Sequence, residues 1–495
     1  MTDTTRFFCR AAALLALAAL APASAQDADA RLGWAGDVSG VHAAAAAPFQ
    51  TVDGTRHAGA VRFYEYGTAW DEAVEVPSPT GTAGTLFGYA VALDGDLAVV
   101  GAPGAQEAGL LAGAAYVYRY VGGAWQLDDT LVPQAPTLGG RSGLAVETAH
   151  GLVAVASWAG CGESGKGGCV DVYRQSGGAW APVAQLALPD DYADAAFGSS
   201  LQIPDASTVV VGAPTSSYGT DRGGEVAVFR EGADGWALAQ RLTLGDATMG
   251  DLFGESVAAT SGVLFVGSPG RSTGDETGAV TVFTDRDGTY EETATLAPPS
   301  TQDHQLFGQS LAVADGRLLV GAPRKDVTDA PDTGEVYVYT VGDAVSYVGA
   351  LGASDAADES GFGYHVRTDG TTDLLGAPFS TVGETAGAGR VELRDPTGAT
   401  AIDGPAAPRA FALHEASPNP FRQSTTLRYA LPAEGHVTLA LYNVLGQRIA
   451  VLVDARQAAG THDVALDAAD LASGVYVAEL AVGDRRATRK VTVLR

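Results

Sequence analysis

The sequence predicts an all-β protein whose main part is built from seven copies of one four-stranded unit. A segment that begins with Phe-Gly and ends with Gly-Ala-Pro, or with close variants of both, recurs along the chain. The copies begin at residues 32, 87, 142, 197, 253, 307 and 362, so that successive starts are 54 to 56 residues apart. A regular period of this length is typical of repeat architectures. The 64 glycines of the chain suit short strands joined by tight turns.

Each copy contains four stretches in which apolar and polar residues alternate, the pattern expected of strands in a sheet. In the sixth copy these strands are expected at 307–314, 317–321, 334–339 and 345–351. Seven antiparallel four-stranded units favour a seven-bladed β-propeller, because closure into a ring leaves few exposed sheet edges. We expect each blade to consist of one continuous unit.

The fourth strand of most copies opens with an aromatic residue. Repeat units bury their apolar faces against neighbouring units, so we expect these rings to pack between blades. They are Trp70, Trp125, Trp180, Trp236, Tyr290 and Tyr347.

The two ends of the chain differ from the repeats. Residues 1–25 resemble a secretory signal peptide, with a basic start, a short apolar run and small residues before a cleavage site between Ala25 and Gln26. The apolar run is too short to span a bilayer, and no later stretch is long enough. The repeats occupy residues 26–405, a linker rich in proline and alanine follows at 406–412, and residues 413–495 form a second domain.

Charge separates the two domains. Residues 413–495 carry eight acidic and nine basic residues, a net charge of +1. Because the net charge of the whole chain is −28, residues 1–412 carry a net charge of −29. An acidic body argues against nucleic acid as a partner, because binding to phosphates needs basic patches.

Two cysteines remain after the signal peptide, Cys161 and Cys169, and they flank a glycine-rich loop. In an exported protein such a pair is expected to form a disulfide. The alternative, half of a metal site, lacks a neighbouring histidine or second cysteine pair.

The Phe-Gly and Gly-Ala-Pro units resemble FG-GAP repeats, the modules of the integrin α-chain propeller and of many exported bacterial proteins. The resemblance covers about residues 32–405 and implies a β-propeller. Family members often carry an Asp-x-Asp-x-Asp-Gly calcium loop between the first two strands. Here that connection is a short turn, such as 94–96 or 315–316, and six or more oxygens cannot converge there. We therefore expect no cofactor or metal ion. Calcium is the one metal that the resemblance to the family implies. The sequence 285–288, Asp-Arg-Asp-Gly, is expected to be a hairpin turn.

Residues 413–495 have the alternating pattern of a small immunoglobulin-like β-sandwich. They resemble the type A sorting domain of the type IX secretion system. The matching segments are 418–421 (PNPF), 441–446 (LYNVLG), 459–462 (AGTH), 471–476 (LASGVY) and 490–494 (KVTVL). The resemblance implies the type IX machinery and its sorting protease as partners. It also implies passage through the periplasm and outer membrane of a diderm bacterium, to the cell surface or the medium.

No catalytic motif appears among the eight histidines or the scattered acidic residues, so we expect no enzyme. The favoured function is an exported binding or adhesion propeller whose ligand is a glycan or a protein. The alternatives are an extracellular polymer-degrading enzyme and a structural component of the cell envelope. The long connections after the second and fourth strands are expected on one face, where binding surfaces are commonly built. Candidate contacts there are Glu163, Lys166, Asp221, Arg222, Arg271 and Arg324.

Overall fold

The structure of the protein is a computed structural model, and the described residues divide into two compact units, within 1–404 and 405–495. The described part of the chain contains strands and turns and no helix. It comprises residues 29–493 except for 68–69, 110, 162–166, 190–195, 220–221, 272–276, 300–303, 328–330, 355–359, 383–384, 396–397, 403–411, 414–415, 417–418, 423, 432–434, 444–446, 458–459, 469–470 and 484. The predicted cleavage site at Ala25 and Gln26 lies outside these residues.

The described residues of the first unit form seven four-stranded antiparallel sheets, numbered here 1 to 7 in chain order. Each sheet uses four consecutive strands. The first strands are β1 (Ala35–Ser39), β5 (Ala90–Asp94), β9 (Val146–Ala149), β13 (Ser200–Asp205), β17 (Ser256–Ala259), β21 (Ser310–Ala314) and β25 (His365–Thr368). The second strands are β2 (His42–Ala47), β6 (Leu97–Ala102), β10 (Leu152–Cys161), β14 (Thr208–Ala213), β18 (Val263–Ser268), β22 (Arg317–Ala322) and β26 (Asp373–Ala377).

The third and fourth strands complete each sheet. The third strands are β3 (Ala60–Tyr66), β7 (Ala114–Val121), β11 (Gly167–Ser176), β15 (Glu225–Gly232), β19 (Ala279–Arg286), β23 (Glu335–Val341) and β27 (Arg390–Asp395). The fourth strands are β4 (Trp70–Pro77), β8 (Ala124–Leu131), β12 (Ala179–Leu186), β16 (Gly235–Leu242), β20 (Thr289–Leu296), β24 (Val345–Gly352) and β28 (Gly398–Ile402). In the sixth copy the first strand begins at Ser310, three residues later than predicted, because Phe307 and Gly308 form a turn with a positive φ at the glycine.

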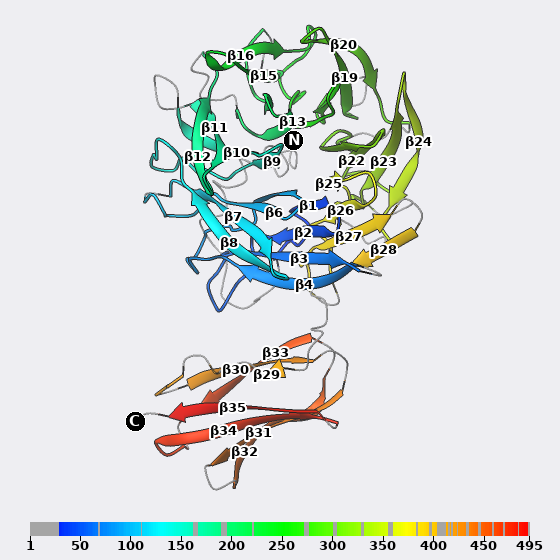
Figure 1. Cartoon of the computed structure of the whole chain (residues 1–495). Helices are drawn as coiled ribbons and strands as arrows, with labels where there is room; N and C mark the ends of the chain where they lie inside the picture. Colours follow the sequence, from blue (N-terminus) through cyan, green and yellow to red (C-terminus); the bar gives the residue numbers. More distant parts are fainter. Residues whose placement is uncertain are drawn as a thin grey trace. The chain divides into compact units, whose positions relative to one another are not determined.

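The seven sheets surround a common axis, as in a propeller (Figure 1). The first strand of each sheet contacts the first strand of the next, and β25 contacts β1. The seam between sheets 7 and 1 uses a contact that recurs between other sheets. Leu32 bridges Gly389 there, as Phe253 bridges Gly224 and Phe307 bridges Gly278. No strand is exchanged between the first and last sheets among the described residues.

The repeated glycines explain this contact. A Cβ on Gly321, the glycine of Gly-Ala-Pro in sheet 6, would lie 2.1 Å from the carbonyl oxygen of Gly363 in the next unit. A Cβ on Gly334, just before the third strand, would lie 2.1 Å from the carbonyl oxygen of Phe362. At this boundary the Phe-Gly turn of one unit therefore packs directly on the backbone of the unit before it, and only glycine leaves room at these two positions.

Aromatic and aliphatic side chains fill the space between sheets. Trp125 of sheet 2 stacks on Phe63 of sheet 1, with ring centroids 4.5 Å apart. Trp70, Trp180 and Tyr290 are buried as well, which confirms the predicted packing role for these rings. Tyr347 differs: it contacts Tyr337 and Tyr339 of its own sheet and is 47% exposed.

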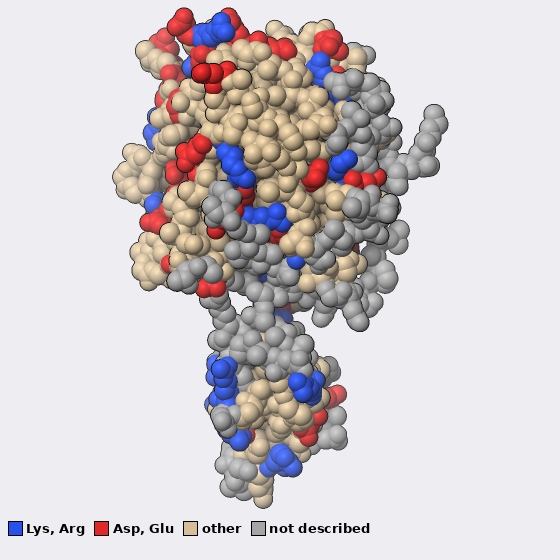
Figure 2. Space-filling model, turned by 90° about the vertical axis from the view of Figure 1, so that its right-hand side faces the viewer, with Lys and Arg blue, Asp and Glu red and all other residues tan. Residues whose placement is uncertain are grey.

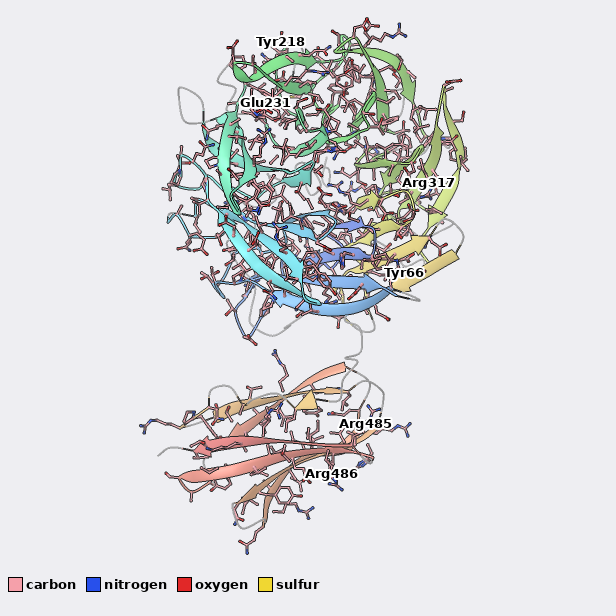
Figure 3. The ribbon with its side chains drawn as sticks, in the orientation of Figure 1. Tyr66, Tyr218, Glu231, Arg317, Arg485 and Arg486 are labelled. Atoms are coloured by element: carbon pink, nitrogen blue, oxygen red, sulfur yellow. The ribbon has the colours of Figure 1, made fainter. Side chains whose placement is uncertain are left out.

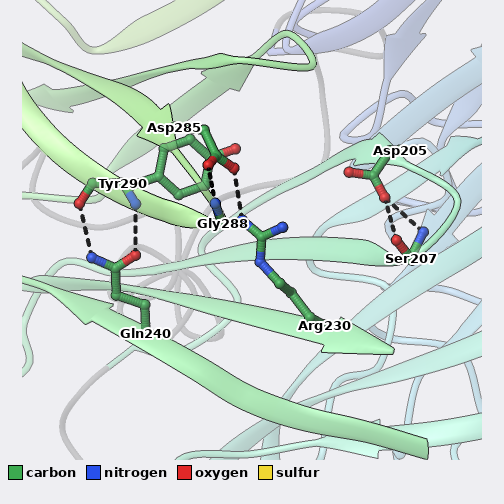
Figure 4. Close-up of polar contacts among 7 residues, drawn as sticks. All are labelled: Asp205, Ser207, Arg230, Gln240, Asp285, Gly288 and Tyr290. Atoms are coloured by element: carbon green, nitrogen blue, oxygen red, sulfur yellow. Dashed lines mark hydrogen bonds and ion pairs between the residues drawn. The ribbon is translucent and has the colours of Figure 1, made fainter. Parts of the chain in front are cut away.

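Polar contacts join neighbouring sheets at their outer strands (Figure 4). Gln240 of β16 both donates to the carbonyl oxygen of Tyr290 on β20 and accepts from its backbone N–H, at 2.8 and 2.9 Å. Arg230 of β15 pairs with Asp285 of β19 at 2.8 Å. Asp285 also accepts from the N–H of Gly288, so the 285–288 segment is the predicted hairpin turn. The carboxylate of Asp285 therefore takes part both in the turn and in the contact between sheets.

The second unit contains a sheet β29-β30-β33 and a sheet β32-β31-β34-β35. Their strands are β29 (Ala412–Leu413), β30 (Ser424–Leu431), β31 (Gly435–Asn443), β32 (Arg448–Gln457), β33 (Gly460–Asp467), β34 (Gly474–Val482) and β35 (Arg485–Val493). Both sheets contribute to one core, which includes Leu427, Leu439 and Val491. Asn419 accepts from the N–H of Thr492 and donates to the carbonyl oxygen of Lys490, which ties the start of this unit to its last strand.

Candidate functional site

The connections of the first unit lie on two opposite faces of the ring of sheets. The connections after the second and fourth strands meet on one face, here called the loop face, where Trp158 donates its N–H to the carbonyl oxygen of Gly140 and Arg324 donates to that of Gln305. The short turns after the first and third strands meet on the other, the turn face, where Val341 donates to the carbonyl oxygen of Gly316. The long connections are thus assembled together.

The structure places three of the six candidate contact residues, all in connections after second strands. Arg222 is exposed, Arg271 is partly buried and pairs with Asp246 at 2.9 Å, and Arg324 is partly buried. They lie on sheets 4, 5 and 6. Arg271 links two connections of the loop face and so is already engaged. Glu163, Lys166 and Asp221 lie outside the described residues.

The cysteine pair lies partly outside the described residues as well. Cys169 is buried in β11 and faces Ser157 of β10 in the strand register. The side chain of Cys161 is not among those described, so the disulfide stays a prediction.

The first strands enclose a central cavity near the loop face, of about 550 Å³ including its solvent-filled mouth. All seven sheets contribute to its wall. Its polar lining residues, besides Arg367, are Ser199, Ser200, Glu255, Ser256, Gln309, Ser310 and His365.

Six of these side chains also hold neighbouring sheets together. Ser200 donates to the carbonyl oxygen of Gly254 at 2.9 Å, and Gln309 donates to Oε1 of Glu255 at 3.2 Å. Ser256 donates to the carbonyl oxygen of Gly308 and Ser310 to that of Gly363, both at 2.7 Å. Nε2 of His365 lies 2.7 Å from the carbonyl oxygen of Gly36, across the seam between sheets 7 and 1. The wall of the cavity is therefore part polar and part apolar, and most of its polar side chains are fixed by hydrogen bonds between sheets.

Arg367 reaches from sheet 7 to carboxylates of two other sheets. Its Nε lies 3.7 Å from Oδ1 of Asp37 in sheet 1, and its Nη2 lies 3.8 Å from Oε2 of Glu147 in sheet 3. Both separations are too long for a hydrogen bond. Asp37 instead accepts from the N–H groups of Val38 and Leu93, at 2.9 and 2.8 Å.

Burial sets the protonation of these two carboxyl groups. Loss of solvation raises the pKa of Glu147 to about 8, although the charge of Arg367 acts in the opposite direction. Burial also raises the pKa of Asp37. Arg367 belongs to the cavity wall, whereas Asp37 and Glu147 are buried and are not part of that wall.

Sequence reasoning missed this cluster. The three residues stand four positions after the glycine of the Phe-Gly turn in copies 1, 3 and 7, where copies 2, 5 and 6 have alanine. A charged residue at an aligned first-strand position was the available signal. The ion pairs themselves join residues more than 200 positions apart, which no local pattern indicates.

Among the described residues, no group of three or more His, Cys, Asp or Glu side chains converges as metal ligands. The described part of the chain contains no helix that is long and apolar enough to cross a membrane. Acidic side chains are prominent on the visible face of the first unit, whereas Lys and Arg side chains are spread over the second (Figure 2). Arg485 and Arg486 of β35 are among the latter (Figure 3).

Comparisons with solved structures show distant similarity. PorZ, an essential bacterial surface component of the type IX secretion system of Porphyromonas gingivalis, is 12% identical over 96% of this chain, with a TM-score of 0.44. This chain covers 61% of the PorZ chain. The β-propeller domain of the trilobed protease from Pyrococcus furiosus is 10% identical over 69% of this chain and 88% of its own, with a TM-score of 0.37. Pyrococcus horikoshii acylaminoacyl peptidase is 8% identical over 82% of this chain and 59% of its own, with a TM-score of 0.44. No curated protein matches the chain.

Family models match both units. Residues 70–118, 236–283 and 290–339 match the FG-GAP repeat. Each match begins at the fourth strand of one sheet and ends in the third strand of the next, so it spans a contact between sheets. Residues 416–494 match the secretion system C-terminal sorting domain, which indicates export to the cell surface or secretion. The chain therefore carries FG-GAP repeats in an all-β, propeller-like first unit and a type IX sorting domain in its second.

Proposed function

We propose that the protein is an exported binding protein, in which a seven-bladed β-propeller is delivered by an immunoglobulin-like sorting domain. Seven consecutive four-stranded sheets, with contacts between β25 and β1, support the blade number. The two sheets around one core in residues 412–493 support the sandwich. In this proposal the type IX machinery and its sorting protease act on the second unit, and the first unit meets an extracellular glycan or protein.

The central cavity is the observation that carries the binding role. Repeat units that only needed to pack would keep apolar residues at their first strands, as Leu311 and Val257 do. Instead, Glu255, Gln309 and Arg367 place polar groups around a space open to the loop face. A concave site with a few convergent polar groups is the usual form of a ligand site.

The test uses the mature chain, residues 26–495, on a glycan array and a peptide array. Charge reversal at three loop-face arginines, Arg222→Glu, Arg271→Glu and Arg324→Glu, should weaken binding at least tenfold. Arg286→Glu, on a hairpin of the turn face, is the matched control and should bind as the unchanged protein does. Thermal unfolding of each variant checks that the fold survives the loss of the contact between Arg271 and Asp246.

Two results would count against this proposal. The first is the absence of any specific ligand on either array. The second is binding that survives the loop-face reversals and is lost with Arg286→Glu, which would move the site to the turn face.

Glu147 favours a second candidate, hydrolysis of an extracellular polymer. A carboxyl group with a pKa near 8 is suited to donate a proton at neutral pH. We rank it second because the neighbouring carboxylate, Asp37, is engaged by two backbone N–H groups. Release of sugars or acids from polysaccharides and esters, abolished by Glu147→Gln, would support this candidate.

A further inference from the structure

The contact between neighbouring sheets has two exceptions in the ring. In five sheets a glycine of the second strand approaches the next Phe-Gly turn, as Gly212 approaches Gly254 and Gly376 approaches Gly33. In sheets 1 and 3 an alanine stands at this place, Ala46 or Ala156. The turn glycine of the next unit would already meet these methyl groups at 2.9 or 2.8 Å if it carried a Cβ. Sheets 1 and 2, and sheets 3 and 4, therefore meet in a different way from the rest.

Between sheets 1 and 2, aromatic rings occupy the loop-face side of the boundary. The ring of Trp34 lies 5.2 Å from that of Phe49 and 5.6 Å from that of Tyr89, measured between centroids. Trp34 and Tyr89 are buried, and Phe49 is packed against the same core. Bulky rings thus complete this boundary.

Between sheets 3 and 4, the equivalent positions hold smaller side chains. Leu144 stands where Trp34 does, Ala159 where Phe49 does, and Ser199 where Tyr89 does. A shallow lateral pocket is present at this boundary, of about 360 Å³ when the solvent at its open mouth is included. Its wall includes Leu144, Ala156, Trp158, Ala196, Phe197 and Ser199.

We propose that this lateral pocket binds an aromatic side chain presented by a partner polypeptide. The same chain fills the equivalent boundary with its own rings, so the geometry suits a planar group of that size. The wall is mainly apolar, and Trp158 offers a ring for edge or offset contacts. The inference rests on the proposed binding function and names the chemistry of one contact.

Exposed apolar residues in other connections of the loop face favour a polypeptide over a free aromatic compound. Leu138 is 75% exposed and Leu111 is 44% exposed. The connection that holds Leu138 is joined to the pocket residue Trp158, whose N–H donates to the carbonyl oxygen of Gly140 at 2.8 Å. Leu111 accepts from the N–H of Arg141 in that same connection, at 3.4 Å. Exposed apolar groups around a recess are typical of sites where a partner inserts an anchor residue.

Ligand-observed NMR on the mature full-length chain tests the proposal with defined probes. N-acetyl-tyrosinamide and N-acetyl-phenylalaninamide should give saturation-transfer signals, and N-acetyl-leucinamide should give signals at least fivefold weaker at equal concentration. Leu144→Trp introduces into the pocket the indole ring that Trp34 supplies at the equivalent position, and Trp158→Ala removes one wall. Each should reduce the aromatic signal at least tenfold. Trp236→Ala, at another half-buried tryptophan, should leave it unchanged.

Three outcomes would overturn the proposal. Binding unchanged in both pocket variants, with unfolding midpoints near that of the parent, would place the probe elsewhere. If p-cresol and N-acetyl-tyrosinamide bound the protein equally well, and Leu138→Ser changed neither affinity, a contact with the backbone of a partner polypeptide would be excluded. Displacement of the aromatic probes by a methyl glycoside would assign the pocket to a sugar. Array binding that persists in any of these cases leaves the proposed function intact, because it depends on the loop-face arginines and the central cavity.

Discussion

At the scale of single residues, the least expected feature is Arg367, a residue of the cavity wall that faces buried carboxyl groups of two other sheets. Two buried carboxyl groups facing one guanidinium leave an excess of negative charge when both are ionised. Burial therefore favours their protonated forms. This places a titrating group inside the ring of sheets, at a pH near neutrality.

The stability of the first unit should fall as pH rises from about 4.5 to about 8. The pKa of Glu147 is raised from 4.5 to about 8, so the folded state holds a proton that the unfolded state has released. Glu147 alone then lowers the free energy of unfolding across this window by at most about 1.4 kcal/mol per pH unit. Urea unfolding at pH 5, 6.5 and 8 measures this slope.

Glu147→Gln should flatten that slope, because the amide does not titrate. Asp94→Asn, at an exposed carboxylate of the turn face, is the control and should retain it. Equal slopes in the parent and in Glu147→Gln would show that Glu147 is not responsible.

Cys161 and Cys169 should be bonded in the mature protein. Alkylation under denaturing, non-reducing conditions should label neither cysteine, whereas prior reduction should add two labels to the mature chain. Two labels without reduction would contradict the pairing.

At the scale of elements, the repeated glycines were read from the sequence as turn and strand-end residues. Their place in the contact between sheets became visible only in the structure. The prediction of strands succeeded because alternation and turn residues are local signals. The exposure of Tyr347 was not predictable in this way, since the contact of a fourth-strand ring depends on residues of the preceding copy.

Gly321→Ala should destabilise the first unit by about 2–4 kcal/mol, since the new methyl group would meet the backbone of the next unit. Gly349→Ala, in β24 of the same sheet, is the matched control, because its added Cβ would have no heavy atom within 4 Å. Denaturant unfolding of both variants gives the comparison. Similar midpoints for the two would mean that the neighbouring unit yields at little cost.

The outer edge of six sheets carries the same irregularity. The register between the third and fourth strands shifts once, for example between Val117 and Tyr118 and between Val282 and Phe283. At each shift, one residue of the fourth strand has no opposite residue in the strand register, for example Asp128 or Thr293. Bulges of this kind twist an edge strand and hinder pairing with a second molecule.

At the scale of the whole molecule, the sequence predicted two domains with separate roles, and the described residues form two compact units. The sorting domain was recognisable because each of its motifs is a short segment of sequence. One such motif contains Asn419, and another contains the end of β35, to which Asn419 is hydrogen-bonded. The central cluster was not recognisable, because it joins copies that are distant in sequence. The lateral pocket was not recognisable either, because it depends on how two consecutive copies pack against each other.

Deletion of residues 405–495 should leave a folded first unit that is retained inside the cell envelope. The reason is that the matched sorting domain lies wholly within this segment, and the core of the first unit does not use it. Cell fractionation and circular dichroism of the purified product test the two parts. Normal export of the truncated protein, or its failure to fold, would contradict the separation of roles.

The seam between sheets 7 and 1 has a consequence for how such a ring changes during evolution. Because each sheet is one uninterrupted stretch of chain and the seam repeats an ordinary contact, gene duplication or loss of about 55 codons adds or removes a whole sheet. No remaining sheet is left split, and only the curvature must adjust. A ring closed by a strand exchanged between its ends would instead tie both termini to one sheet. In this chain the number of copies is therefore free to drift by recombination, while the ends of the gene remain unconstrained by the ring.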